Sequence, residues 1–310
     1  MSVLAATALY TTPLLIAATG ELMAERAGVV NIGVEGMMLT GALAGFAVAA
    51  QVAPASGPGV AVLAGMGAAV AAAVVLGLVF AVVVVPLGAD QIVAGAGVNL
   101  LAVGATALLF KALPVAPRGV TTLAGGTWWM AGVAVAGVGL VGVYLRRTRA
   151  GLELTAIGEA PHAADAAGVP VGRRKVLAIC FAAACAGVAG AYLSTLRVWS
   201  FQENMTEGQG FLALAIVIFG RWSATGVLVA AAFFGLVRAV ALQAEAQTGP
   251  LYPVIERVLS AVAPASRAGA ADAIHFALRA LPYVVTLIAL AGLAGRSGSP
   301  AGLGKAYARE

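Results

Sequence analysis

The sequence predicts an all-α polytopic membrane protein with about 8–10 transmembrane helices, some of them broken or re-entrant. Of its 310 residues, 61% are hydrophobic and only 10% are charged, and the mean hydropathy is +0.99. A soluble domain carries about 25% charged residues and could not hide this much apolar surface. The run Val176–Leu196 has no charge, is long enough to cross a bilayer, and directly follows Arg173, Arg174 and Lys175.

Basic residues predict the orientation of the chain. The loop from Arg146 to Lys175 lies between two apolar runs and carries a basic cluster at each end, as cytoplasmic loops do. The basic tail Arg296–Glu310 is predicted on the same side, and Ser200–Gln209, with two glutamates and no basic residue, on the outer side. Because the excess positive charge lies beside the spans, it indicates a lipid bilayer and no nucleic-acid partner.

Apolar runs bounded by charges or Gly/Pro clusters give about nine hydrophobic elements. In chain order they are 2–20, 27–50, 59–87, 91–110, 128–145, 176–196, 210–220, 227–242 and 280–295. The turn Pro54–Gly59 separates the second element from the third. The run 210–220 is too short to cross alone and forms a broken helix or a re-entrant hairpin with 227–242. Because one re-entrant element would reverse the parity, the side of the N-terminus stays open.

Segment 243–273 is predicted to be extracytoplasmic. It contains apolar residues on one helical face, which is typical of a short amphipathic helix lying on the membrane surface. Those residues are Leu251, Val254, Ile255, Val258, Leu259 and Val262.

Two interruptions occupy comparable places in the two halves of the chain. Residues 29–36 and 216–222 are each a Gly-interrupted apolar segment followed by a run rich in small residues. Paired broken helices of this kind often line a transport pathway and accompany an inverted pseudo-repeat, which we expect here. The alternative is that each is an ordinary short loop between spans.

Three polar residues within apolar runs are candidates for a pathway. Glu35 is costly in a membrane unless it meets a partner or water, and Asn31 is predicted one helical turn before it on the same face. The pair would line a polar cavity or hold the broken helix; alternatively, Glu35 lies at the membrane edge in water. Asn99 suits a buried hydrogen bond, and Asp90 is predicted to cap the helix that follows it.

Other chemistries have little support in the sequence. Cys180 and Cys185 project in different directions from one helix, and His162 and His275 are too far apart to suggest a metal site. No Gly-x-x-x-x-Gly-Lys-Ser/Thr loop is present, so this chain is not expected to hydrolyse ATP. We expect no catalytic residue, no metal and no cofactor, which argues against an intramembrane enzyme.

Residues 25–38, ERAGVVNIGVEGMM, resemble the hallmark segment of ABC-importer permeases, in the nucleoside and simple-sugar branch related to ribose and galactose permeases. Residues 156–161 (AIGEAP), with the Ala163-Ala164 and Ala167-Gly168-Val169 runs, resemble that family's cytoplasmic loop, which contacts the ATPase. The break Gly220–Gly226 also resembles a Gly-rich break at this place in the family. The resemblance covers nearly the whole chain, in the right order.

The resemblance implies two sets of functional residues. The translocation pathway would include Asn31, Glu35 and Asn99. A helix within 154–168, broken or started at Pro161, would seat in a groove on the ATPase; the alternative is a solvated connector. The implied coupling residues are Glu159, Ala160, Ala164, Gly168, Arg173 and Arg174.

The resemblance also implies partners and a substrate. We expect a single transmembrane permease domain over residues 1–310 in a bacterial cell membrane, working with a second homologous permease subunit. A separate ATPase with tandem nucleotide-binding domains and an extracytoplasmic substrate-binding lipoprotein would complete the importer. Arg221-Trp222-Ser223 departs from the Gly-Gly-Thr of the sugar branch, which favours nucleosides over simple sugars. An ion-coupled secondary carrier is the other transport class, but it usually has more membrane carboxylates.

Overall fold

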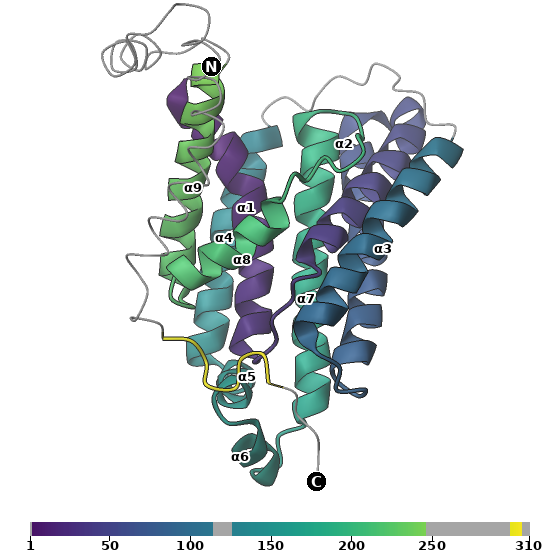
Figure 1. Ribbon diagram of the computed structural model, residues 1–310. Coiled ribbons are helices and arrows are strands. Elements are labelled where there is room, and N and C mark those ends of the chain that lie inside the picture. Colours follow the sequence, from purple (N-terminus) through teal and green to yellow (C-terminus); the bar gives the residue numbers. More distant parts are fainter. Residues whose placement is uncertain (1, 114–125, 246–297, 306–310) are drawn as a thin grey trace, which may run out of the picture.

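A computed structural model describes residues 2–113, 126–245 and 298–305. Every regular element in these ranges is a helix, and six helices are long and apolar enough to cross a membrane, which confirms an all-α polytopic membrane protein (Figure 1). The elements are α1 Val3–Arg26, α2 Val34–Val84, α3 Gln91–Ala112, α4 Gly126–Arg147, α5 Arg149–Glu159, α6 Pro161–Ala166, α7 Val171–Ala191, the π-helix Tyr192–Arg197, α8 Gln209–Phe219 and α9 Ala224–Glu245.

Helix α2 is a hairpin and supplies two passes. Its 51 residues are interrupted at Gly57, whose φ of 76° is left-handed, between Pro54 and Pro58. The two arms then pack together, since a Cβ placed on Gly65 would lie 2.6 Å from the carbonyl oxygen of Gly45. The turn predicted at Pro54–Gly59 is therefore confirmed.

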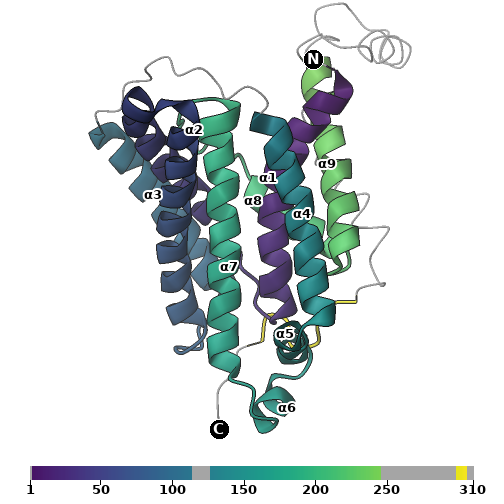
Figure 2. The same cartoon turned by 180° about the vertical axis from the view of Figure 1, so that it is seen from behind.

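Helix α7 packs against both arms of α2 through small residues. A Cβ on Gly41 would lie 2.5 Å from the Cα of Gly187, and a Cβ on Gly187 would lie 2.5 Å from the carbonyl oxygen of Ala69. Such close backbone approach is how transmembrane helices associate without a hydrophobic driving force. From behind, α7 stands between the α2 hairpin and the pair α1 and α4 (Figure 2).

Helix α1 is longer than the predicted span 2–20. It continues to Arg26 because Glu21 and Glu25, whose charges suggested the end of the span, are only 0% and 2% exposed. Both glutamates are buried inside the protein, so neither is solvated at the end of the span.

The bundle has two distinct ends. Helix α1 begins and α9 ends at one of them, and α5, α6 and residues 298–305 lie at the other (Figure 1). The predicted loop 146–175 thus lies at the end opposite the start of α1. The predicted span 280–295 and the predicted surface helix 251–262 fall outside the described residues, and so does most of the outer segment 243–273.

Candidate functional site

The first break, residues 27–33, turns back into the bundle after α1. Gly28 has a φ of 80°, and Asn31 Nδ2 donates a hydrogen bond of 2.9 Å to Glu21 Oε1, more than one turn before the end of α1. Asn31 is not helical, and α2 begins at Val34. The prediction that Asn31 and Glu35 share a helical face is therefore wrong: Asn31 faces α1, and Glu35 faces α8.

Side chains of α3 bind the free backbone groups around the first break. Asn99 Nδ2 donates to the carbonyl oxygen of Ile32 at 2.9 Å, and Asn99 Oδ1 accepts from the backbone N–H of Gly36 at 2.8 Å. Gln91 Oε1 accepts from the N–H of Val30 at 2.7 Å. Non-helical backbone at membrane depth needs such partners. Asn99 makes the predicted hydrogen bonds, but they are only partly buried.

Glu35 lies at the N-terminal end of α8. Its Oε1 accepts from the Thr206 hydroxyl at 2.5 Å and from the Gly208 N–H at 2.8 Å, and its Oε2 accepts from the Gly210 N–H at 2.6 Å. The residue is only 6% exposed, so the alternative of a solvated edge position is wrong. Since Gly208, the N-cap of α8, has no side chain, Glu35 supplies the cap from another element.

Two helix N-termini meet at this carboxylate. Glu35 lies in the first turn of α2 and accepts from the first turn of α8, so it is next to the positive ends of two helix dipoles. A carboxylate in this place is stabilised by both helices and cancels their partial charge. The junction therefore presents no free positive end to an anionic solute.

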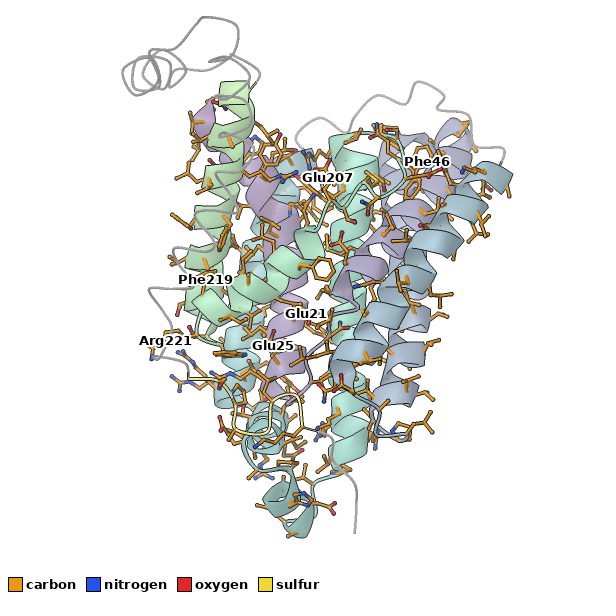
Figure 3. The ribbon with its side chains drawn as sticks, viewed as in Figure 1. Glu21, Glu25, Phe46, Glu207, Phe219 and Arg221 are labelled. Carbon is orange, nitrogen blue, oxygen red and sulfur yellow. The ribbon has the colours of Figure 1, made fainter. Side chains whose placement is uncertain are left out.

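The other end of α8 is attached to α1. Trp222, 4% exposed with a φ of 51°, donates its indole N–H to Glu25 Oε2, and Arg26 Nε donates to the Trp222 carbonyl oxygen at 2.8 Å. The Ser223 hydroxyl closes the turn by donating to the Gly220 carbonyl oxygen at 2.7 Å. Helix α8 is thus held at both ends by residues of α1 and α2. Figure 3 labels Glu25 of α1 together with Phe219 and Arg221, which lie at the C-terminal end of α8.

Glu25 and Trp222 lie in segments that the sequence singled out, but neither they nor Glu21 were predicted as site residues. The only local signal was the placement of two carboxylates one turn apart immediately before the first break. Their partners lie far along the chain: Trp222 is 197 residues from Glu25.

Helices α5 and α6 form the predicted coupling region. A groove of about 630 Å³ runs between them, with an alanine-rich lining that includes Glu159, Ala160 and Ala164. Helix α6 starts at Pro161, and Gly168, with a φ of 83°, lies just beyond its end. The helix predicted within 154–168 is therefore broken at Pro161, into the end of α5 and the short helix α6.

The two arginines of the predicted coupling set lie outside this groove. Arg173 is exposed near the start of α7, and Arg174 pairs with Glu153 of α5. Arg174 therefore fastens α5 to α7, and its guanidinium is engaged within the chain.

The coupling region contacts the first break directly. A Cβ on Gly158 would lie 2.2 Å from the carbonyl oxygen of Arg26 and 3.3 Å from the Gly28 nitrogen. Residues 298–305 bind both sides of this contact. The N–H of Gly302 donates to the carbonyl oxygen of Gly158 at 2.8 Å, and the N–H of Gly304 donates to the carbonyl oxygen of Gly28 at 3.3 Å. The C-terminal part of α5 is therefore in direct contact with the end of α1 and with the first break.

The elements described above together define a membrane transport permease. They are the apolar spans, the first break and helix α8, which meet inside the bundle, and the short helices α5 and α6 at one end. The chain belongs to the family described as the permease component of the branched-chain amino acid transport system, whose model matches residues 3–263. It is an ABC transporter permease and a multi-pass membrane protein.

Three relatives extend over most of the chain. The putative glucose ABC transporter permease protein TsgC13 of Haloferax volcanii is 34% identical over 80% of this chain and 79% of its own length. The guanosine permease NupQ of Bacillus subtilis is 28% identical, covering 97% of this chain and 95% of NupQ. The nucleoside permease NupC of Lactococcus lactis is 28% identical, covering 96% and 94%. No solved structure matches.

Within residues 2–113, 126–245 and 298–305, no group of three or more His, Cys, Asp and Glu side chains is arranged to hold a metal ion.

Proposed function

We propose that this chain is the membrane subunit of an ATP-driven importer for nucleosides, and that a separate ATPase chain drives it. The near full-length similarity to two nucleoside permeases carries this proposal. The Glu35 junction supports a neutral solute, because its carboxylate cancels the positive helix ends that would attract a phosphate. Nucleosides are uncharged, whereas nucleotides are not.

A simple sugar is the second candidate substrate. It is also neutral, and the relative with 34% identity is named as a putative glucose permease. The turn Arg221-Trp222-Ser223 argues against a sugar, because it departs from the Gly-Gly-Thr of the sugar branch. In this turn the indole N–H of Trp222 donates to Glu25.

The α5–α6 groove is the proposed docking site of the ATPase. Its alanines allow close approach, and the contact of Gly158 with Arg26 and Gly28 gives a direct route from the docked helices to the first break. In this mechanism, movement of the ATPase displaces α5, and α5 displaces the junction where α2 and α8 meet.

The proposed translocation pathway includes the three residues that were predicted from the sequence, Asn31, Glu35 and Asn99. Residues 31–36 would border the route, at or beside the contact with a second permease subunit. In this proposal Asn31, Glu35 and Asn99 hold the broken segments by hydrogen bonds. A substrate-binding lipoprotein would deliver the solute at the end of the bundle where α1 begins, and the whole chain would act as one permease domain.

The direct test is ATP-dependent uptake into vesicles that contain the complete reconstituted importer. Radiolabelled guanosine, adenosine and uridine are compared with ribose and glucose, with and without ATP. Uptake of at least one nucleoside, competed by other nucleosides and not by sugars, is expected. Uptake of glucose or ribose alone would replace the nucleoside assignment by the sugar assignment.

Coupling is tested with two glycine variants near α6. Gly168→Val forces a β-branched residue into a left-handed backbone and should abolish uptake and substrate-stimulated ATPase activity while the permease stays in the membrane. Gly172→Ala is the matched control, because its Cβ would meet only Val85 at 3.6 Å, an ordinary contact. Normal uptake by the Gly168 variant would refute the coupling assignment.

Orientation is tested by single cysteines in a cysteine-free background. A cysteine at Ala160 should react with an impermeant reagent only from the cytoplasmic side, and one at Glu203 only from outside. Labelling of position 160 from outside would invert the proposed topology.

A further inference from the structure

Two buried oxygen atoms between α1 and the first break have no hydrogen-bond partner. Glu21 and Asn31 are each 0% exposed and share one hydrogen bond, from Asn31 Nδ2 to Glu21 Oε1 at 2.9 Å. The second carboxyl oxygen of Glu21, Oε2, and the single amide oxygen of Asn31, Oδ1, are buried without a partner. Both orphaned atoms are acceptors when the carboxyl is ionised, so the group that is missing is a hydrogen.

The surroundings do not favour a negative charge on Glu21. Among the described residues, the titratable groups that interact with it are Glu25, one turn further along α1, and the thiol of Cys185 on α7. The nearby guanidinium of Arg26 donates to Trp222 instead. An ionised carboxylate without a cation is costly at membrane depth.

We propose that Glu21 is a proton-binding site. The protonated Oε2 donates to Asn31 Oδ1 while Asn31 Nδ2 donates to Oε1, so that the acid and the amide close a planar ring. One proton then satisfies both orphaned atoms, and the ring fastens the first break to α1 without a charge. Loss of the proton places two acceptors against each other and loosens the segment that leads to α2 and contacts α5.

A bridging water is the competing arrangement. A water molecule could donate one hydrogen to each orphaned oxygen and leave Glu21 ionised, in which case the site binds no proton. The two arrangements differ in the protonation of the carboxyl, which infrared spectroscopy detects directly.

The first experiment is an infrared spectrum of the reconstituted transporter complex. The wild type should show the C=O stretch of a protonated carboxyl, which shifts in D2O. Glu21→Gln should remove this band, and Glu25→Gln should retain it. Asn31→Ala should retain it at higher frequency because the carboxyl loses its hydrogen-bond partner. A spectrum without the band, or a band lost only with Glu25→Gln, overturns the proposal.

The second experiment uses the fact that glutamine imitates a neutral glutamic acid. Glu21→Gln can donate from Nε2 to Asn31 Oδ1 and rebuild the ring, so uptake should stay within about twofold of wild type, whereas Glu21→Ala should fall about tenfold or more. Uptake by the wild type should decline at alkaline pH relative to Glu21→Gln. If both variants reach wild-type levels in the membrane and their uptake is equally impaired, the charge of Glu21 is required and the proposal is overturned. A loss of nucleoside specificity would bear only on the proposed substrate.

Discussion

The first break and the α8 segment, residues 206–223, meet in the bundle but are held by different chemistry. The first break is bound by the amides of Asn99 and Gln91, and the amide of its own Asn31 binds Glu21. The α8 segment is bound by the carboxylates of Glu35 and Glu25, with a guanidinium at its far end. Both segments contain irregular backbone inside one helical bundle, so their depth alone does not decide which side chains hold them.

The difference follows from the backbone groups that each segment leaves free. The first break leaves a carbonyl at Ile32 and an N–H at Gly36, and one amide, Asn99, can accept and donate at once. The start of α8 leaves only N–H groups and the Thr206 hydroxyl, which a carboxylate satisfies with two acceptor oxygens. The chemical type of each side chain therefore matches the polarity of the unpaired backbone.

The largest expected effect is at Glu35. Glu35→Ala leaves three donors without an acceptor, two of them buried and one partly buried, which should cost about 3 kcal/mol or more in the stability of the junction. Uptake per inserted permease should fall by roughly 100-fold, far more than membrane expression. Uptake kinetics and quantitative immunoblotting of the same vesicles check this.

Glu35→Gln removes the negative charge of residue 35 but keeps the size and shape of its side chain. A glutamine keeps one acceptor oxygen but turns an NH₂ group toward an N–H donor, so its uptake should lie between that of Glu35→Ala and the wild type. Uptake by the alanine variant within about twofold of wild type would remove Glu35 from the proposed pathway.

An intermediate effect is expected when the amide of Asn99 is replaced by a carboxylate. Asn99→Asp keeps the acceptor for Gly36 but loses the donor to Ile32, and should lower the free energy of unfolding by about 1–3 kcal/mol. Asp90→Asn is the reverse exchange on the same helix and keeps the oxygen that caps α3, so it should have little effect. Thermal unfolding of both variants in detergent tests the claim; equal Tm values would mean that the amide is dispensable.

The sequence predicted the parts of this arrangement that rest on local patterns. The spans, the hairpin turn near Gly57, the Asp90 cap and the start of α6 at Pro161 follow from apolar runs and from proline, glycine and cap residues. It failed where helical periodicity was extended through Gly28 and Gly33, because the non-helical chain between Asn31 and Glu35 sends them to different neighbours.

The long-range partners had no local signal. Glu21 and Glu25 look like the polar end of a span when only the sequence is considered, because charges usually mark the membrane boundary. Only the folded bundle places Trp222 against Glu25 and Gly210 against Glu35. The helix caps of α8 come from other elements, and no pattern around residues 206–210 indicates which residue provides them.

A smaller effect is expected at the far end of α8. Trp222→Phe removes one donor to Glu25 but keeps most of the buried ring and the backbone carbonyl that binds Arg26, so the cost should be about 1 kcal/mol. Trp129→Phe, at a position 37% exposed in α4, is the matched control and should leave the Tm unchanged. A decrease in Tm as large as that of Glu35→Ala would mean that the two ends of α8 are equally important.

The smallest effect is expected at an ion pair on the surface. Lys111 Nζ lies 3.3 Å from Glu203 Oε1, and the pair joins the end of α3, the helix that binds the first break, to the loop that leads to α8. Because the two side chains are 70% and 50% exposed, water and salt screen their attraction, and Lys111→Gln should change stability by about 0–1 kcal/mol. The small difference should disappear in high salt, whereas the Glu35 and Asn99 effects should persist because those contacts are shielded from solvent. Thermal unfolding of Lys111→Gln, Glu35→Ala and Asn99→Asp at low and high ionic strength makes this comparison. A large loss of stability for Lys111→Gln that persists in high salt would show that the two segments are joined at the surface as strongly as inside the bundle.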